Sequence, residues 1–248
     1  MKPHFISGLL LLAAGSFVHA ATYSFATSAE YDANFREVQN GGAIAHNAAG
    51  YLSNTGMNQT VVVAYDTDGA GAGTTLYPVT LGTTLSASAD VRFTDPGSFG
   101  IYFSAVGGGT TYLALLNPTT GNDQFRFFSG GTMSTGAAGT QNFSNNATNP
   151  VNLNEFTNIS ATYEVLSATS IRISMTAGTQ TFSQLYEGTT LPAQVEIAFR
   201  SYNPTVTDPT PSPISDIDNF TVTDPIPEPS AIALAGLGLL GLVAGRRR

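Results

Sequence analysis

Apolar and polar residues alternate with a period of two over much of the chain. Between Leu85 and Phe93 the odd-numbered positions are apolar, and the even-numbered positions are serine, aspartate or arginine. After a turn sequence around Pro96, the same alternation resumes from Phe99 to Ala105. Because a β-strand turns successive side chains to opposite faces of a sheet, each segment predicts a strand with one buried face.

Later segments repeat this pattern and are separated by turns rich in glycine, proline and asparagine. Further strands are predicted at 112–116, 159–165, 171–175, 195–200 and 218–222. Regular half-buried strands of this kind predict an all-β domain, an antiparallel β-sandwich. Three stretches are predicted to lie outside strands: loops at 66–73 and 130–150, and an extended connection at 202–213.

The N-terminus departs from the alternation. Lys2 is followed by an apolar run from Phe5 to Val18 and by small residues up to Ala20. These are the features of a secretory signal peptide, so residues 1–20 are expected to form a signal helix that a signal peptidase removes after Ala20.

The C-terminus also departs from it. Residues 231–245 are fifteen positions without a charge, and three arginines follow them. A helix of that length spans about 22 Å, against about 30 Å for a bilayer hydrocarbon core. We therefore expect a short transmembrane helix at about 230–245, with the arginines held in the cytoplasm and the preceding chain outside.

The last residues combine Pro227-Glu228-Pro229, the apolar run and Arg246-Arg247-Arg248, in that order. This arrangement resembles the PEP-CTERM sorting signal of Gram-negative bacteria. The resemblance covers 225–248 and implies processing by an exosortase. It also implies export across the inner membrane, transient membrane anchoring, and delivery to the cell surface or extracellular matrix.

The region between the two ends, 21–224, is long enough for one extracellular domain with a single core. Its strands at 112–116, 125–128 and 197–201, with the closing Asp218-Asn219-Phe220, resemble the concanavalin-like jelly-roll domains. That resemblance implies a two-sheet jelly roll.

Charge and composition narrow the classes of function. Residues 21–224 hold five arginines, no lysine and sixteen acidic residues, a net charge of −11. Such a surface argues against nucleic acid and anionic lipid as partners, because both are bound largely through Lys and Arg. The chain has no cysteine, which excludes disulfides and thiolate chemistry.

Candidate chemistry is sparse. His46 is the one histidine of 21–224, and we expect it in an exposed loop. Nothing matches the Glu-x-Asp-x-Glu strand that the concanavalin-like glucanases use, so the domain is not expected to be an enzyme. Asp66 and Asp68 lie two residues apart in a glycine-rich loop, which suits either a calcium ion or an acidic turn without a ligand.

Four arginines interrupt apolar strands at the outward positions: Arg92, Arg126, Arg172 and Arg200. Arg126, with Tyr102 and Phe128, could line a glycan groove, because aromatic rings stack on sugars while polar groups hold hydroxyls. The alternative is that these arginines keep an outer face soluble.

The sequence therefore favours an exported surface or matrix protein with a non-catalytic domain that binds extracellular polysaccharide. Two other hypotheses stay open. One is a structural or adhesive matrix protein without a ligand site, and the other is a carbohydrate-active enzyme.

Overall fold

The computed structural model describes residues 20–40, 44–54, 60–65, 75–94, 97–118, 123–147, 151–202 and 215–223. The predicted signal helix up to position 19, the loop at 66–73 and the tail at 225–248 lie outside these ranges. Within them, no helix combines the length and apolar character that crossing a bilayer requires.

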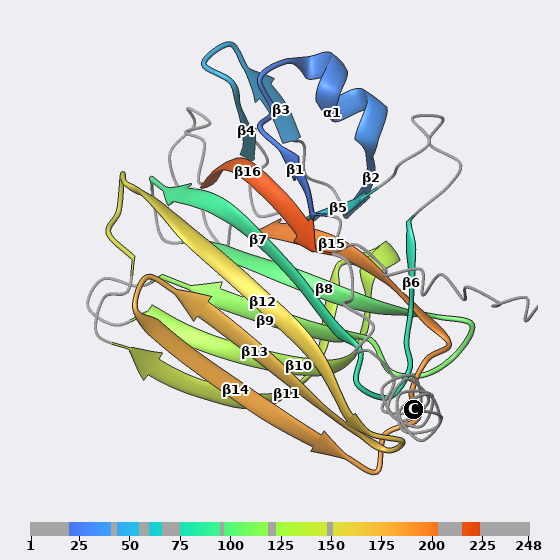
Figure 1. Cartoon of the computed structure of the whole chain (residues 1–248). Helices are drawn as coiled ribbons and strands as arrows, with labels where there is room; N and C mark the ends of the chain where they lie inside the picture. The colour runs from blue at the N-terminus through green and yellow to red at the C-terminus, as the bar shows by residue number, and fades with distance from the viewer. Residues whose placement is uncertain are drawn as a thin grey trace, which may run out of the picture.

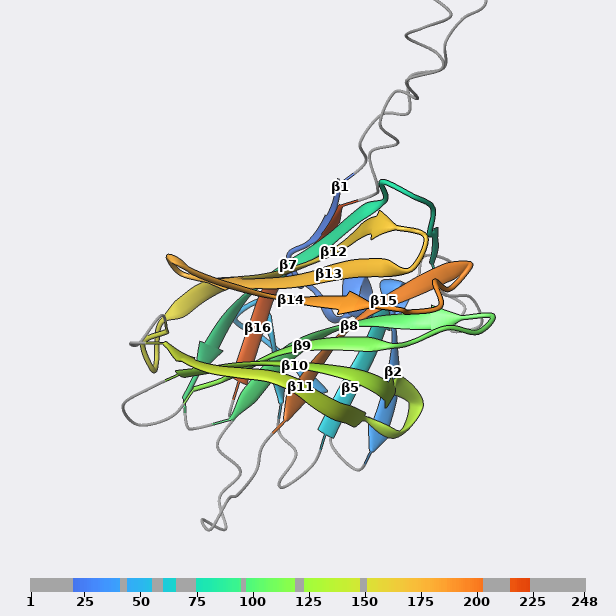
Figure 2. The same cartoon turned by 90° about the horizontal axis from the view of Figure 1, so that it is seen from below.

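The described strands form two sheets packed face to face (Figures 1 and 2). Sheet A has the order β14-β13-β12-β7-β16-β4-β3, with β1 added beside β16. Its strands are β1 (Ala20–Tyr23), β3 (Ile44–Asn47), β4 (Tyr51–Asn54), β7 (Thr84–Phe93), β12 (Phe156–Ser167), β13 (Ser170–Ala177), β14 (Gln180–Glu187) and β16 (Ser215–Thr223).

Sheet B lies behind sheet A in Figure 1 and below it in Figure 2. Its order is β11-β10-β9-β8-β15-β5-β2, with β6 added beside β15. Its strands are β2 (Phe35–Asn40), β5 (Thr60–Tyr65), β6 (Leu76–Pro78), β8 (Ser98–Val106), β9 (Tyr112–Asn117), β10 (Asp123–Thr132), β11 (Ala137–Ala147) and β15 (Gln194–Tyr202). The strand pairs among the described residues are antiparallel, which confirms the predicted antiparallel β-sandwich.

The hydrophobic core lies between the inner faces of the two sheets. The apolar positions of β7, from Leu85 to Phe93, are at most 2% exposed, as their alternation predicts. At one lateral edge, Phe125 of β10 meets Phe182 of β14 with ring centroids 4.8 Å apart. Fully burying one such side chain contributes about 1.5–3 kcal/mol, so packing can hold this cysteine-free sandwich together.

The two ends of the described domain meet in sheet A. β1 pairs with the end of β16, so that Ala20 lies opposite Thr223. The predicted signal-peptidase site after Ala20 therefore falls within β1, and residue 225, where the predicted tail begins, follows β16 by two positions. The domain boundaries at 20/21 and 224/225 stay predictions.

The predicted loop at 130–150 is wrong. β10 continues to Thr132, the 3₁₀ turn η1 (Met133–Thr135) follows, and β11 returns along β10. Few side chains of β11 are apolar, so this edge strand shows no alternation. Its glycines instead permit close backbone approach: a Cβ on Gly139 would overlap the carbonyl oxygen of Ser129.

One helix, α1 (Ser28–Asn34), was not predicted. Seven residues are too few to display a helical period. Its start is instead marked by a cap, because Thr27 Oγ1 accepts a hydrogen bond from the Glu30 amide at 3.2 Å. The Glu30 carboxylate in turn accepts from the amides of Ser24 and Ala26 at 3.1 and 3.2 Å.

Candidate functional site

The outer face of sheet B is hollowed near the ends of β10 and β15. Strand register places Arg126, Leu115, Gly100 and Arg200 in one row across β10, β9, β8 and β15. Both arginines border a cavity of about 250 Å³, which we call the arginine cavity. Its described wall consists of Ser98, Leu115, Asn117, Arg126, Phe128, Ala138, Arg200 and Tyr202.

Arg200 is 8% exposed and lies on the central strand β15. Its guanidinium carbon is 5.1 Å from the ring centroid of Tyr202, within the range of a cation–π contact. Burial lowers the pKa of Arg200, because removing a cation from water disfavours its charged form. The structure thus holds a poorly hydrated positive charge at this wall.

Arg126 approaches the cavity from β10. Its Nε donates to Gln124 Oε1 at 3.0 Å, and a terminal nitrogen donates to the same oxygen. A neutral amide therefore orients the guanidinium, and this amide carries no charge to compensate it. Arg126 forms no ion pair with a described residue at the distances that define the three ion pairs of this domain.

The two aromatic residues predicted with Arg126 lie on the same face of sheet B, in one row on either side of Leu113, but only Phe128 is in the described cavity wall. Phe128, 8% exposed, is in the cavity wall. Tyr102 is fully buried, and its hydroxyl donates to the Ala137 carbonyl at 3.1 Å. Tyr102 is therefore placed to support the site rather than to stack on a ligand. Both belong to a small cluster with Val62, Leu113, Leu115, Met133 and Ala198.

Sequence reasoning missed Tyr202, Ser98 and Asn117. Tyr202 was assigned to the connection at 202–213, whereas it is the last residue of β15. The available signal was the continued alternation from Arg200 to Tyr202, which places both on one face. Ser98 enters the site because it pairs with Tyr202 across the β8–β15 ladder, and the alternation does not reveal such pairing.

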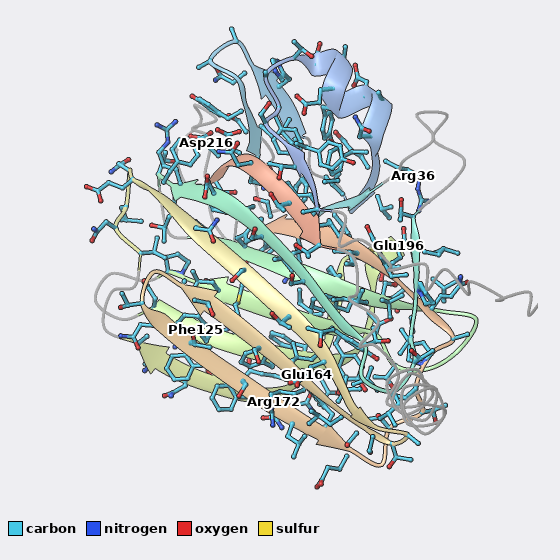
Figure 3. All side chains as sticks on the ribbon, in the orientation of Figure 1. Arg36, Phe125, Glu164, Arg172, Glu196 and Asp216 are labelled. Carbon is cyan, nitrogen blue, oxygen red and sulfur yellow. The ribbon has the colours of Figure 1, made fainter. Side chains whose placement is uncertain are left out.

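A second cavity, of about 420 Å³, lies on the same face beside η1. Arg36 and Glu196 line it together with Ser104, Thr111 and Met133. Arg36 Nη2 is 3.0 Å from Glu196 Oε1, and Figure 3 labels both residues. In this η1 cavity the positive charge is neutralised by its neighbour.

Arg92 and Arg172 lie on the opposite side of the molecule, on the outer face of sheet A. Arg92 donates to Asp216 Oδ2 from Nε at 2.9 Å and from Nη2 at 2.6 Å, which raises the Arg92 pKa. The rings of Tyr51 and Phe156 flank its guanidinium at 5.1 and 4.8 Å. The outward arginines are therefore divided between two faces.

Arg172 pairs with Glu164 at 3.0 Å on the neighbouring strand (Figure 3). Between the ion pairs, sheet A presents rows of hydroxyl side chains, which we call the hydroxyl face. One row across the strands is Thr22, Thr221, Ser88, Ser160, Thr176 and Thr181. A second row is Thr223, Ser86, Thr162, Ser174 and Ser183.

The remaining candidates from the sequence are His46 and the two predicted calcium ligands, Asp66 and Asp68. The prediction that His46 lies in an exposed loop is wrong. His46 lies in β3, where its Nε2 is 2.8 Å from the Phe25 carbonyl oxygen. In the part of the chain that the structure describes, no group of three His, Asp or Glu side chains could hold a metal ion. Asp66 and Asp68 lie outside that part, so the calcium site stays a prediction.

Near the end of sheet A, Asp218 and Asp90 lie on paired strands around Asn219. Asn219 has a φ of 50° and donates from Nδ2 to Asp90 Oδ2 at 2.9 Å. Burial, followed by the charge of Asp90, raises the Asp218 pKa above its ordinary value. Asn219 thus occupies a left-handed turn that asparagine tolerates well.

A family model described as the PEP-CTERM protein-sorting motif matches residues 225–248. The match contains each of the six predicted sorting residues, Pro227, Glu228, Pro229, Arg246, Arg247 and Arg248, and confirms the resemblance. The motif indicates exosortase-dependent export and membrane-associated sorting in Gram-negative bacteria. No curated protein matched the chain.

Several solved structures are similar at low identity. A protein of unknown function from Shewanella oneidensis MR-1 is 15% identical over 91% of this chain and 97% of that one, with a TM-score of 0.47. Lectin UEA-II complexed with galactose is 9% identical over 85% of this chain and 100% of the lectin chain, with a TM-score of 0.48. A Bacillus licheniformis β-glucanase is 10% identical over 83% of this chain and 97% of the glucanase chain, with a TM-score of 0.46.

Proposed function

We propose that this protein is exported and sorted by an exosortase, and that its concanavalin-like sandwich is a non-catalytic module that binds extracellular polysaccharide. The observation that carries the proposal is the arginine cavity on sheet B, where aromatic and polar side chains converge. Small-molecule and sugar sites are concave and combine apolar walls with a few polar groups. The described wall of this cavity has that composition.

Each part of the wall has a role in holding sugars. The rings of Tyr202 and Phe128 supply faces on which the C–H side of a pyranose can pack. Asn117 and Ser98 supply donors and acceptors for hydroxyl groups. Tyr102 fixes the start of β11 through the bond to Ala137, so this part of sheet B is held in place before a ligand arrives.

The charges around the site favour binding over hydrolysis. Glycoside hydrolysis commonly uses two carboxyl groups that flank the scissile bond. The charged residues on the described wall are both arginines. Glu196, in the neighbouring η1 cavity, is held by Arg36 at 3.0 Å.

The two ends of the chain fit the same proposal. Signal peptidase would act after Ala20 and an exosortase at the tail, after transient anchoring in the inner membrane by 230–245. The protein would then reside at the cell surface or in the extracellular matrix, where polysaccharide is available.

Binding of the full chain to a panel of immobilised polysaccharides tests the proposal. We expect at least one to bind, and Tyr202→Ala to weaken that binding at least tenfold, about 1.4 kcal/mol, because the ring face is lost. The matched control is Leu185→Ala, which removes a 45%-exposed side chain from the outer face of sheet A. If Tyr202→Ala left polysaccharide binding unchanged, the arginine cavity would not be the binding site. A panel without any binder would favour a structural matrix role.

A further inference from the structure

The wall of the η1 cavity contains two polar side chains that are more than nine-tenths buried and have unused hydrogen-bonding capacity. Glu196 of β15 is 7% exposed, and Ser104, its cross-strand partner on β8, is 9% exposed. Glu196 Oε1 accepts a hydrogen bond from Arg36 Nη2 at 3.0 Å. Within the part of the chain that the structure describes, Glu196 Oε2 and the Ser104 hydroxyl make no hydrogen bond. Because buried polar groups are normally satisfied, these two indicate a place for a ligand or for ordered water.

The strand register brings these groups together at one side of the cavity. Directly opposite residues of antiparallel strands have Cβ atoms about 4.5–5.5 Å apart, so Ser104 and Glu196 project from adjacent points of the wall. Arg36 reaches the same carboxylate from β2 (Figure 3). The wall thus combines a charged acceptor, a charged donor and a hydroxyl that can act as either. Two neighbouring hydroxyl groups of one ligand can donate to Glu196 and accept from Arg36 at the same time.

The rest of the wall is held in place by contacts within sheet B. Thr111 Oγ1 accepts from the Ala105 amide at 3.1 Å, and the Thr111 carbonyl accepts from the Gly130 amide at 2.9 Å. Met133 anchors η1 by packing in the small apolar cluster of this face. A wall that is ordered in advance lowers the entropy cost of binding. Met133 and Val38 also give the cavity an apolar side, against which C–H groups can pack.

The paired charges select the kind of ligand. Because Arg36 and Glu196 are in contact, an anion would be repelled by Glu196 and a cation by Arg36. A neutral ligand with adjacent hydroxyl groups meets neither repulsion. The cavity volume, about 420 Å³, lies within the range of about 300–1,000 Å³ that is typical of small-molecule sites.

We propose that the η1 cavity is a second binding site, which takes a neutral sugar unit through hydrogen bonds to Glu196, Ser104 and Arg36. The identification of the hydroxyl-bearing ligand as a sugar rests on the proposed function, whereas the site itself is separate from the arginine cavity. Glu196 and Arg200 are four residues apart on β15, about 13 Å at about 3.3 Å per residue.

Methyl NMR of the full chain, isotope-labelled at the methionine methyl groups, tests this inference with three neutral disaccharides: isomaltose, mannobiose and galactobiose. Met133 lines the η1 cavity, whereas Met175 is fully buried in the core between the sheets. We expect at least one disaccharide to shift the Met133 signal saturably and to leave the Met175 signal unchanged. Glu196→Gln should lower the affinity measured at Met133 about tenfold or more, because hydrogen bonds to a charged acceptor are the stronger ones.

Glu164→Gln is the matched control, because Glu164 forms the corresponding ion pair with Arg172 at 3.0 Å on sheet A. It should leave the disaccharide affinity unchanged, and thermal melting should show both variants folded. Ser104→Ala removes one hydroxyl and keeps the ion pair, so it decides the question if Glu196→Gln unfolds. We expect it to lower the affinity about threefold or more.

The possible outcomes separate this site from the arginine cavity. Tyr202→Ala should leave disaccharide binding at Met133 unchanged. If no disaccharide shifted the Met133 signal, the inference would be overturned even where polysaccharide bound at the arginine cavity, and ordered water would account for the buried groups. Equal losses of affinity in Glu196→Gln and Glu164→Gln would also overturn it. So would a shift of the Met133 signal by calcium chloride alone, which would indicate a cation site.

Discussion

The outer faces of the two sheets arise from the same alternation of residues but carry different chemistry. On sheet A, the outward positions form rows of serine and threonine, and both outward arginines pair with carboxylates. On sheet B, the outward positions form an apolar cluster, two cavities and a pair of arginines that share one cavity. Sheet A spreads small hydroxyl groups evenly, whereas sheet B concentrates charge and aromatic rings.

The difference shows that a solvent-facing arginine has to be interpreted with its neighbours. Arg92 is satisfied by Asp216 and two rings, so its role on sheet A is to hold β7, β16 and β4 together. Arg200 occupies an equivalent outward position on sheet B but faces a cavity. The same residue type therefore forms an ion pair on one face and borders a cavity on the other.

Replacing each arginine by methionine should separate these roles most strongly. Arg92→Met leaves Asp216, which is 1% exposed, as a buried carboxylate without its cation. We expect the free energy of unfolding to fall by about 3 kcal/mol. Arg126→Met should cost less than half as much, because the hydrogen-bond partner that it leaves behind is the neutral amide of Gln124. Urea denaturation of the full-length variants measures both, and equal losses would break the comparison.

Two buried tyrosines offer a smaller test. Tyr102→Phe removes the hydrogen bond to Ala137 on the sheet B face, and we expect a loss of about 1 kcal/mol. Tyr163→Phe is the control in the core, since its buried hydroxyl makes no hydrogen bond to a described residue. It should change stability by well under 1 kcal/mol. A larger loss for Tyr163→Phe would show that the Tyr102 bond does not support the face.

The smallest change in folding stability is expected at Asp218 on sheet A, and it should depend on pH. Because its pKa is raised in the folded state, folding favours the protonated acid, and the stability contributed by this group declines as pH rises through the folded pKa. Asp218→Asn removes that decline. Denaturant midpoints should therefore favour the variant more at pH 7 than at pH 3. A difference that is the same at both pH values would argue against the raised pKa.

Much of the sandwich could be predicted from the chain because its strands are half-buried. The alternation from Leu85 to Phe93 and from Ile159 to Val165 records directly which side chains face the core. β11 could not be predicted in this way. Its pairing with β10 is made by backbone groups and close-packed glycines, which impose no apolar period.

The candidate site was predictable only in part, for a related reason. Arg126 and Phe128 stand two residues apart on one strand, so their shared face follows from the alternation. Arg200 joins them because β15 pairs with β8 in a register that links segments about a hundred residues apart. The burial of Tyr102 and its bond to Ala137, the first residue of β11, join segments far apart in the chain, which no local pattern records.

Hydroxyl-radical footprinting of the full chain, with and without a saturating polysaccharide that it binds, tests most directly whether the outer face of sheet B is the ligand-binding face. We predict that Tyr202 becomes protected when the ligand is present, because it lies in the wall of the arginine cavity. Phe156 and Leu185 on sheet A, 42% and 45% exposed, should keep their reactivity. Protection of Phe156 and Leu185 with no change at Tyr202 would contradict this assignment.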